Sequence, residues 1–211
     1  MEKKNTILLT VIAVATLLVA VVGATFAYFS AQGGDAAQAD VIVKTGTSSS
    51  ASLGTFSAIS IYADQTNFIQ GGEDQSGTST GTVSWTAPGS TPTYNPTAEE
   101  RTMCYNVVLN VTKNDFEYTT TEETPELIFR AEKDSVAIID DMDITKTTTD
   151  VQIPTVKDGR DFKHVLTAEA GLTQSNNWKL TVTLKNLATD QQKNTGKTFT
   201  GAVKFTKVDC Q

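Results

Sequence analysis

Histidine is almost absent from this chain of 211 residues, which contains only His164. A zincin-type protease requires two histidines one helical turn apart, and a nucleophilic cysteine or serine requires a neighbouring base. The glycine patterns of nucleotide-binding loops and the Gly-x-Ser-x-Gly turn of hydrolases are missing as well. The sequence therefore predicts a protein that is not an enzyme and needs no cofactor, with His164 as an ordinary, half-buried strand residue.

Helical patterns are also scarce. After residue 30, no run of ten or more residues repeats its apolar side chains with the 3.6-residue period of a helix. The chain is rich in threonine and in short β-branched and aromatic stretches between turn-forming residues, which is typical of strands. These features predict an all-β fold, an antiparallel β-sandwich of the jelly-roll or immunoglobulin-like type. Strands are expected near residues 40–44, 55–62, 81–85, 102–112, 126–131, 135–139 and 199–205.

Two stretches indicate which face of a strand is buried. Residues 102–112 have apolar side chains at odd positions, and residues 177–186 have them at even positions. Because side chains alternate between the two faces of a strand, the apolar set should face the core. A hairpin is expected to join residues 163–172 to 177–186, and another to turn at Lys133-Asp134. The predicted core set is Tyr105, Val107, Leu109, Val111, Trp178, Leu180, Val182 and Leu184.

The N-terminus contrasts with the remainder of the chain. Two lysines precede the segment Ile7–Phe29, which contains no charged residue. A span of about 20 apolar residues can cross a bilayer, whereas the apolar part of a secretory signal is typically about 7–15 residues. Length therefore favours a leader helix kept as a membrane anchor, while the small residues Thr25 and Ala27 fit the −3 and −1 positions of a cut between Ala27 and Tyr28.

The residues around this junction resemble a known leader. The stretch Val22-Gly23-Ala24-Thr25-Phe26-Ala27-Tyr28-Phe29-Ser30 is similar to the leader of the TasA/camelysin family of exported Gram-positive surface and biofilm-matrix proteins. Beyond residue 30 the similarity extends only to general character. The resemblance implies cleavage by a dedicated signal peptidase and a secreted or cell-surface product that begins at Tyr28. Members of the camelysin branch have been described as metalloproteases, but the zincin motif is missing here.

Acidic residues outnumber basic residues, 24 to 17. The formal net charge is −7 at pH 7, and the acidic and basic residues are scattered rather than grouped in blocks. An acidic protein of this kind is not attracted to nucleic acid or to anionic lipid by long-range electrostatics. Contact with a membrane is therefore expected only through the leader, if the leader is retained.

Cysteine occurs only twice, at Cys104 and Cys210. In an exported protein an even pair most often forms a disulfide, which here would clip the C-terminal strand to the middle of the domain. Two free thiols and a bridge between chains are the alternatives.

Two weaker groups of residues suggest binding. Asp140, Asp141 and Asp143 could gather oxygen ligands around calcium, although their spacing does not match an EF-hand and a solvated acidic turn is the preferred interpretation. The aromatic residues Tyr62, Phe68, Trp85 and Tyr94 lie in or near the glycine- and proline-rich region 64–100, which is expected to be mostly loop. They could line a carbohydrate or protein contact, or pack the loop onto its own domain.

The expected organisation is a signal peptide at 1–27, an N-terminal extension at 28–52 and a β-sandwich domain at 53–211. The function predicted from the leader and the strand pattern is an exported structural subunit of a cell-surface or biofilm-matrix fibre, which self-associates. A strand donated by the extension to the edge of a neighbouring subunit would join such a fibre. The alternatives are that residues 40–45 pair within their own domain, and that the protein is a monomeric secreted or membrane-anchored adhesin.

Overall fold

The computed structural model describes residues 43–44, 47–64, 68 and 72–211. Every strand pair in these ranges is antiparallel, and helical structure is limited to short 3-10 turns such as η2 (Gln192–Asn194). The expected all-β class is therefore confirmed for this part of the chain. None of its helices has the length and hydropathy of a membrane span.

The strands form two five-stranded sheets and one small ladder. The first sheet has the order β3 (Ser50–Ser52), β5 (Gln75–Thr86), β11 (Thr173–Leu184), β7 (Leu127–Lys133) and β8 (Val136–Asp143). The second has the order β10 (His164–Thr167), β6 (Thr102–Asn114), β12 (Thr198–Val208) and β4 (Ile59–Tyr62), with β9 (Val151–Gln152) paired to β6. The ladder joins β1 (Val43–Lys44) to β2 (Thr47–Ser48).

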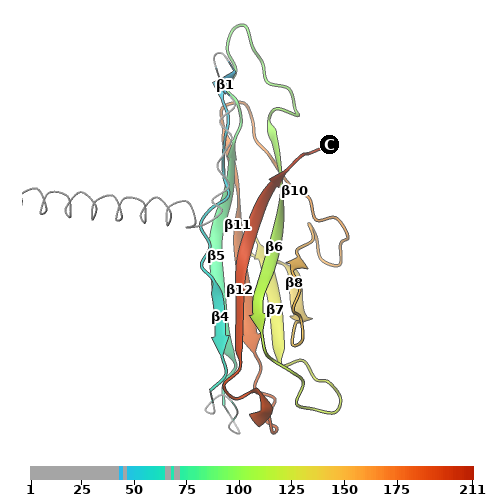
Figure 1. Ribbon diagram of the computed structural model, residues 1–211. Coiled ribbons are helices and arrows are strands. Elements are labelled where there is room, and N and C mark those ends of the chain that lie inside the picture. The colour runs from blue at the N-terminus through green and yellow to red at the C-terminus, as the bar shows by residue number, and fades with distance from the viewer. Residues whose placement is uncertain (1–42, 45–46, 65–67, 69–71) are drawn as a thin grey trace, which may run out of the picture. The chain divides into compact units, whose positions relative to one another are not determined.

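The inner faces of both sheets share one hydrophobic core, so the architecture is a β-sandwich. The long strands of the two sheets run lengthwise beside each other (Figure 1). The predicted alternation is confirmed, because every member of the predicted core set is at most 9% exposed. Trp178, Tyr105 and Phe129 are among the largest fully buried side chains.

The predicted hairpin between residues 163–172 and 177–186 is wrong. Strand β10 pairs with β6 in the second sheet, whereas β11 pairs with β5 and β7 in the first. The chain crosses between the sheets at Gly171, which adopts a φ of 74°. An apolar alternation determines which face of a strand is buried, but it does not determine the neighbouring strand. Here β10 and β11 both bury their apolar faces in the core, but each belongs to a different sheet.

The region 64–100 contains more strand than expected. The sequence predicts a strand at residues 81–85, whereas β5 begins six residues earlier at Gln75. Its inward positions at this end include Gly77 and Gly81, which lack the apolar side chains that signal a strand. Gly81 lies against the Phe56 ring, because a Cβ atom there would be 2.4 Å from the ring, so any other residue would force the ring to move.

The hairpin between β7 and β8 is confirmed, but its turn residues are Asp134 and Ser135 rather than the predicted Lys133-Asp134, because β7 extends through Lys133. Both have positive φ values, 51° and 68°, as the central residues of a type I′ turn require. Strand β8 continues to Asp143, so the acidic residues at 140–143 lie on an edge strand rather than in a turn.

The extension differs from the expectation as well. The serine-rich residues 47–52, for which no strand was expected, contain β2 and β3, and β3 pairs with the end of β5. Val43 and Lys44 pair with Ser48 and Thr47, so this part of the proposed donated strand already has a partner within the chain. The leader and the expected cleavage site at Ala27 and Tyr28 lie outside the described residues.

The predicted disulfide is present between Cys104 and Cys210. Their Cα atoms are 5.2 Å apart, and the bond joins the start of β6 to the residues that follow β12. Disulfides persist in oxidising compartments, so the bond fits a protein that is exported.

Candidate functional site

The outer face of the first sheet carries an unusual set of side chains. Serine and threonine occupy all the outward positions of β3 and β5 and most of those of β11. We call this surface the hydroxyl face. Its side chains are Ser50, Ser52, Ser76, Thr78, Thr80, Thr82, Ser84, Thr86, Thr173, Ser175, Asn177, Lys179, Thr181 and Thr183.

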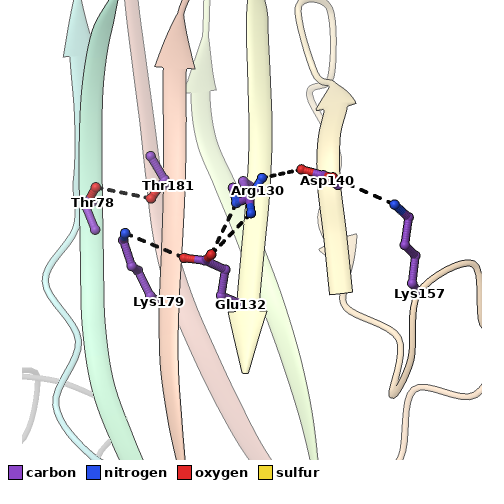
Figure 2. Close-up of polar contacts among 7 residues, drawn as sticks. All are labelled: Thr78, Arg130, Glu132, Asp140, Lys157, Lys179 and Thr181. Carbon is purple, nitrogen blue, oxygen red and sulfur yellow. Dashed lines mark hydrogen bonds and ion pairs between the residues drawn. The ribbon is translucent and has the colours of Figure 1, made fainter. Parts of the chain in front are cut away.

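Hydrogen bonds between β5 and β11 hold much of the hydroxyl face in place. Residues directly opposite each other on neighbouring strands are close enough for their side chains to interact. Four opposed pairs are bonded through their side chains, and Figure 2 shows one of them. They are Ser76–Thr183 at 2.7 Å, Thr78–Thr181 at 3.2 Å, Thr82–Asn177 at 2.9 Å and Thr86–Thr173 at 2.7 Å.

Among the described residues this ladder of side-chain bonds has no bond at the Ser84–Ser175 pair, and it is also interrupted at Thr80, which lies opposite Lys179. The Nζ atom of Lys179 lies 3.5 Å from Oε2 of Glu132 on β7 (Figure 2). In Figure 2 the ammonium group lies between β5 and β11, and the Glu132 carboxylate reaches toward it from β7. Among the described residues, the hydroxyl of Thr80 has no hydrogen-bond partner, so it remains available to a ligand.

Charged side chains continue the face across β7 and β8. Arg130 contacts Glu132 at 3.3 Å and also Asp140, and Lys157 lies 3.7 Å from the other oxygen of Asp140 (Figure 2). Cations and carboxylates alternate along this row, so neither sign of charge dominates the surface. The pairs are partly exposed, and their individual contributions to stability are expected to be small.

A groove of about 520 Å³ opens on this surface where the ladder is interrupted. The groove contains both donors and acceptors of hydrogen bonds: its hydroxyl and amide groups do both, its ammonium group donates and its carboxylate accepts. Its lining residues are Thr80, Gly81, Thr82, Glu132, Ser135, Asn177, Trp178 and Lys179.

No protein-family model, curated protein or solved structure was found to match this chain. Function is therefore argued from the geometry of the described residues and from the leader.

His164 lies in strand β10 as expected, but it is fully rather than half buried, with 1% of its surface exposed. Its Nε2 atom lies 3.0 Å from the carbonyl oxygen of Ile153. The ring stacks on Tyr105 and meets Trp178 edge-on, with centroid distances of 5.3 and 4.9 Å. Burial is the main cause that lowers the pKa of His164 to about 4. The residue is a neutral part of the core.

The buried imidazole makes stability depend on pH. The lowered pKa means that the unfolded chain binds a proton between about pH 6.5 and pH 4 while the folded chain does not. The stability that the neutral, buried imidazole provides is fully present above about pH 6.5 and decreases as the pH falls toward about 4. Between pH 7.5 and pH 5 we expect the unfolding free energy to drop by about 2 kcal/mol. In urea titrations, His164→Phe should remove most of this slope; an unchanged slope would contradict the assignment.

The acidic residues at 140–143 do not gather around a common point. Asp143 accepts hydrogen bonds from Tyr118 at 2.6 Å and from Thr145 at 2.7 Å, whereas Asp140 pairs with Arg130. In the ranges that the structure describes, no group of three or more acidic, histidine or cysteine residues could hold a metal ion. The structure therefore lends no support to the calcium alternative.

The four aromatic residues do not form a shared surface. Trp85 is 5% exposed, and its indole N–H donates a hydrogen bond of 2.9 Å to the carbonyl of Arg101. Phe68 packs against the core, and Tyr62 is exposed. Trp85 therefore fits the alternative that these residues pack onto their own domain, because the Arg101 carbonyl accepts the hydrogen bond of its polar atom and the core covers its ring.

Proposed function

We propose that this protein is an exported, non-enzymatic subunit of a cell-surface or matrix fibre, in which subunits join by strand addition. The observation that carries the proposal is the contrast between the two edges of the first sheet. One edge contains backbone groups that no described strand pairs with, and the other is protected against pairing.

The unprotected edge belongs to β5. Strand β3 pairs only with Ser84–Thr86, so residues 75–83 have β11 on one side and no described strand paired with them on the other, although the segment that joins β3 to β4 approaches Thr82 and β4 approaches Gly77. This stretch, which we call the open edge of β5, contains no charged residue and no proline. Unpaired N–H and C=O groups on such an edge can accept a strand from another chain.

The edge formed by β8 is protected. The register shifts between Phe129 and Ala131, opposite Asp140 and Asp141, and Asp141 has a φ of 54°. Bulges and charged side chains on an edge strand prevent pairing with other chains. Self-association through this sheet is therefore directed to the open edge of β5.

The N-terminal segment 28–45 is the proposed donor. Of this segment the structure describes Val43 and Lys44, which pair in the two-residue β1–β2 ladder, and so short a ladder is marginal by itself. A strand given by one subunit to the next is a head-to-tail contact, and such contacts produce open filaments when the rotation does not close. The leader would keep the donor unavailable until export.

The finer fold assignment is also a proposal. We infer a jelly-roll rather than an immunoglobulin-like sandwich, because β12 lies between β4 and β6 while β11 lies between β5 and β7. Most successive strands along the chain therefore change sheets, which favours a double-sheet jelly-roll.

Two forms of the protein that begin at different residues test how the subunits assemble. Protein that begins at Tyr28 should form filaments, whereas protein that begins at Thr47 should stay a folded monomer, because it retains every strand except β1. Sedimentation and electron microscopy distinguish the two outcomes. If both forms polymerise equally, or if neither polymerises, strand donation is wrong.

The mature N-terminus is a separate prediction. Intact-mass analysis of protein exported by the native host should show a chain that begins at Tyr28, because Thr25 and Ala27 fit a peptidase site. A product that keeps residues 7–27 and remains in the membrane fraction would make the leader an anchor.

The second candidate is a monomeric adhesin or binding module. The groove on the hydroxyl face favours it, because a binding site on an outer sheet face does not require assembly. Monomeric behaviour at all concentrations, together with ligand binding, would favour this alternative over the fibre.

A further inference from the structure

We propose that the groove on the hydroxyl face binds a neutral polysaccharide through its sugar hydroxyls. This inference does not depend on fibre assembly, because every residue that lines the groove belongs to one chain. Its basis is the combination of an open groove, an interrupted hydrogen-bond ladder and balanced charge.

The groove has the size and the chemistry of a sugar site. Its volume of about 520 Å³ falls within the range of about 300–1,000 Å³ typical of small-molecule sites. The hydroxyl of Thr80 has no partner in the part of the chain that the structure describes, and the Glu132 carboxylate accepts two bonds of 3.3 Å from Arg130 through its Oε1 atom. Its Oε2 atom contacts only Lys179, at 3.5 Å, so this oxygen retains capacity to accept a hydrogen bond.

The groups around the groove are held in position before a ligand arrives. Thr82 donates a 2.9 Å hydrogen bond to Asn177, and the Asn177 backbone N–H donates a 2.7 Å bond to Asp134. Arg130 and Lys179 fix Glu132 from two sides. These polar groups are already ordered in the folded protein, so a ligand would bind without the entropy cost of ordering them.

Other partners fit this surface less well. Protein interfaces have apolar, aromatic-rich centres, whereas the outward positions of β3, β5 and β11 contain no apolar side chain. Nucleic acids require an excess of cations, and here Lys179 is offset by Glu132. A neutral, hydroxyl-rich chain matches both the hydrogen-bonding groups and the charge balance.

The test is affinity electrophoresis of the exported form through gels that contain dextran, glucomannan, galactan or hydroxyethylcellulose, with polygalacturonate as an anionic comparison. At least one neutral polymer should retard the protein, and polygalacturonate should not. Thr80→Val should weaken binding about threefold to tenfold, since it removes one hydrogen bond. Glu132→Gln should weaken it more, because charged acceptors form stronger bonds.

Thr183→Val is the matched control. Thr183 lies on the hydroxyl face like Thr80, but outside the groove, and its hydroxyl already bonds to Ser76. Valine is well accommodated in strands, so both threonine variants should fold. The proposal is overturned if no neutral polymer retards the protein, if Thr80→Val and Thr183→Val have equal effects, or if polygalacturonate binds more tightly. It is also overturned if Thr80→Val instead abolishes self-association in sedimentation, because the occupant would then be a second copy.

Discussion

Replacing Glu126 with leucine is expected to lower the free energy of unfolding by about 3–5 kcal/mol. The Glu126 side chain is fully buried at the start of β7, where no described cation pairs with it. One carboxylate oxygen accepts hydrogen bonds from the backbone N–H and the hydroxyl of Thr119, and the other accepts bonds of 2.8 Å from Gln191 and from Asn194. Leucine would remove the acceptor of all four bonds, and the Gln191 and Asn194 amide groups would keep only their bonds to the carbonyl oxygens of Lys185 and Glu117.

Urea unfolding followed by tryptophan fluorescence measures the effect. Glu126→Gln should be destabilising but less so than leucine, because glutamine keeps one acceptor oxygen. Glu123→Gln is the control, because Glu123 is exposed and the substitution removes only its ion pair with Lys146, in which the charged atoms are 3.7 Å apart. Stability of Glu126→Leu within about 0.5 kcal/mol of the parent would show that the buried bonds contribute nothing net.

Removing the disulfide is expected to cost a similar amount. Cys104 and Cys210 are separated by 106 residues, and closing a loop of about 100 residues is worth up to about 4.7 kcal/mol in the chain-entropy model. Cys210→Ser should therefore lower the unfolding free energy by a few kcal/mol and lower Tm. The cost arises mainly in the unfolded chain, which gains freedom when the two positions are no longer linked.

Mass spectrometry under non-reducing conditions should find one internal bridge in the exported monomer. The parent protein measured in reductant should match Cys210→Ser, because both lack only the bond. Free thiols at both positions, a disulfide-linked dimer as the only species, or an unchanged Tm on reduction would contradict this account.

Local features of the fold could be predicted from the sequence, whereas strand partners could not. The alternation in β6 and β11 identified their buried faces, because burial on one face imposes a period of two. The partner of β10 depended on where the chain crosses between sheets, which no alternation encodes. Residues 75–80 were missed as strand because Gly77 and Ser79 replace the apolar inward positions that usually mark one.

The candidate site was only partly visible in the sequence. The disulfide could be predicted because the chain has only two cysteines. The hydroxyl face could not, although Ser76, Thr78, Thr80 and Thr82 alternate with glycine and serine, a period of two that indicates a strand with a polar outer face. The groove also needs Glu132 and Asn177, which only strand pairing brings together.

Hydrogen–deuterium exchange of filaments against monomers tests the central claim most directly. If a donated strand pairs with the open edge of β5, amides in residues 75–83 that face this edge should exchange more slowly in the filament, because they gain backbone hydrogen bonds. Amides of β8 should keep their monomer rates, since that edge is protected. Filaments in which residues 75–83 exchange as fast as in the monomer would contradict strand addition at this edge, and a gain of protection at β8 would place the joint on the opposite side of the sheet.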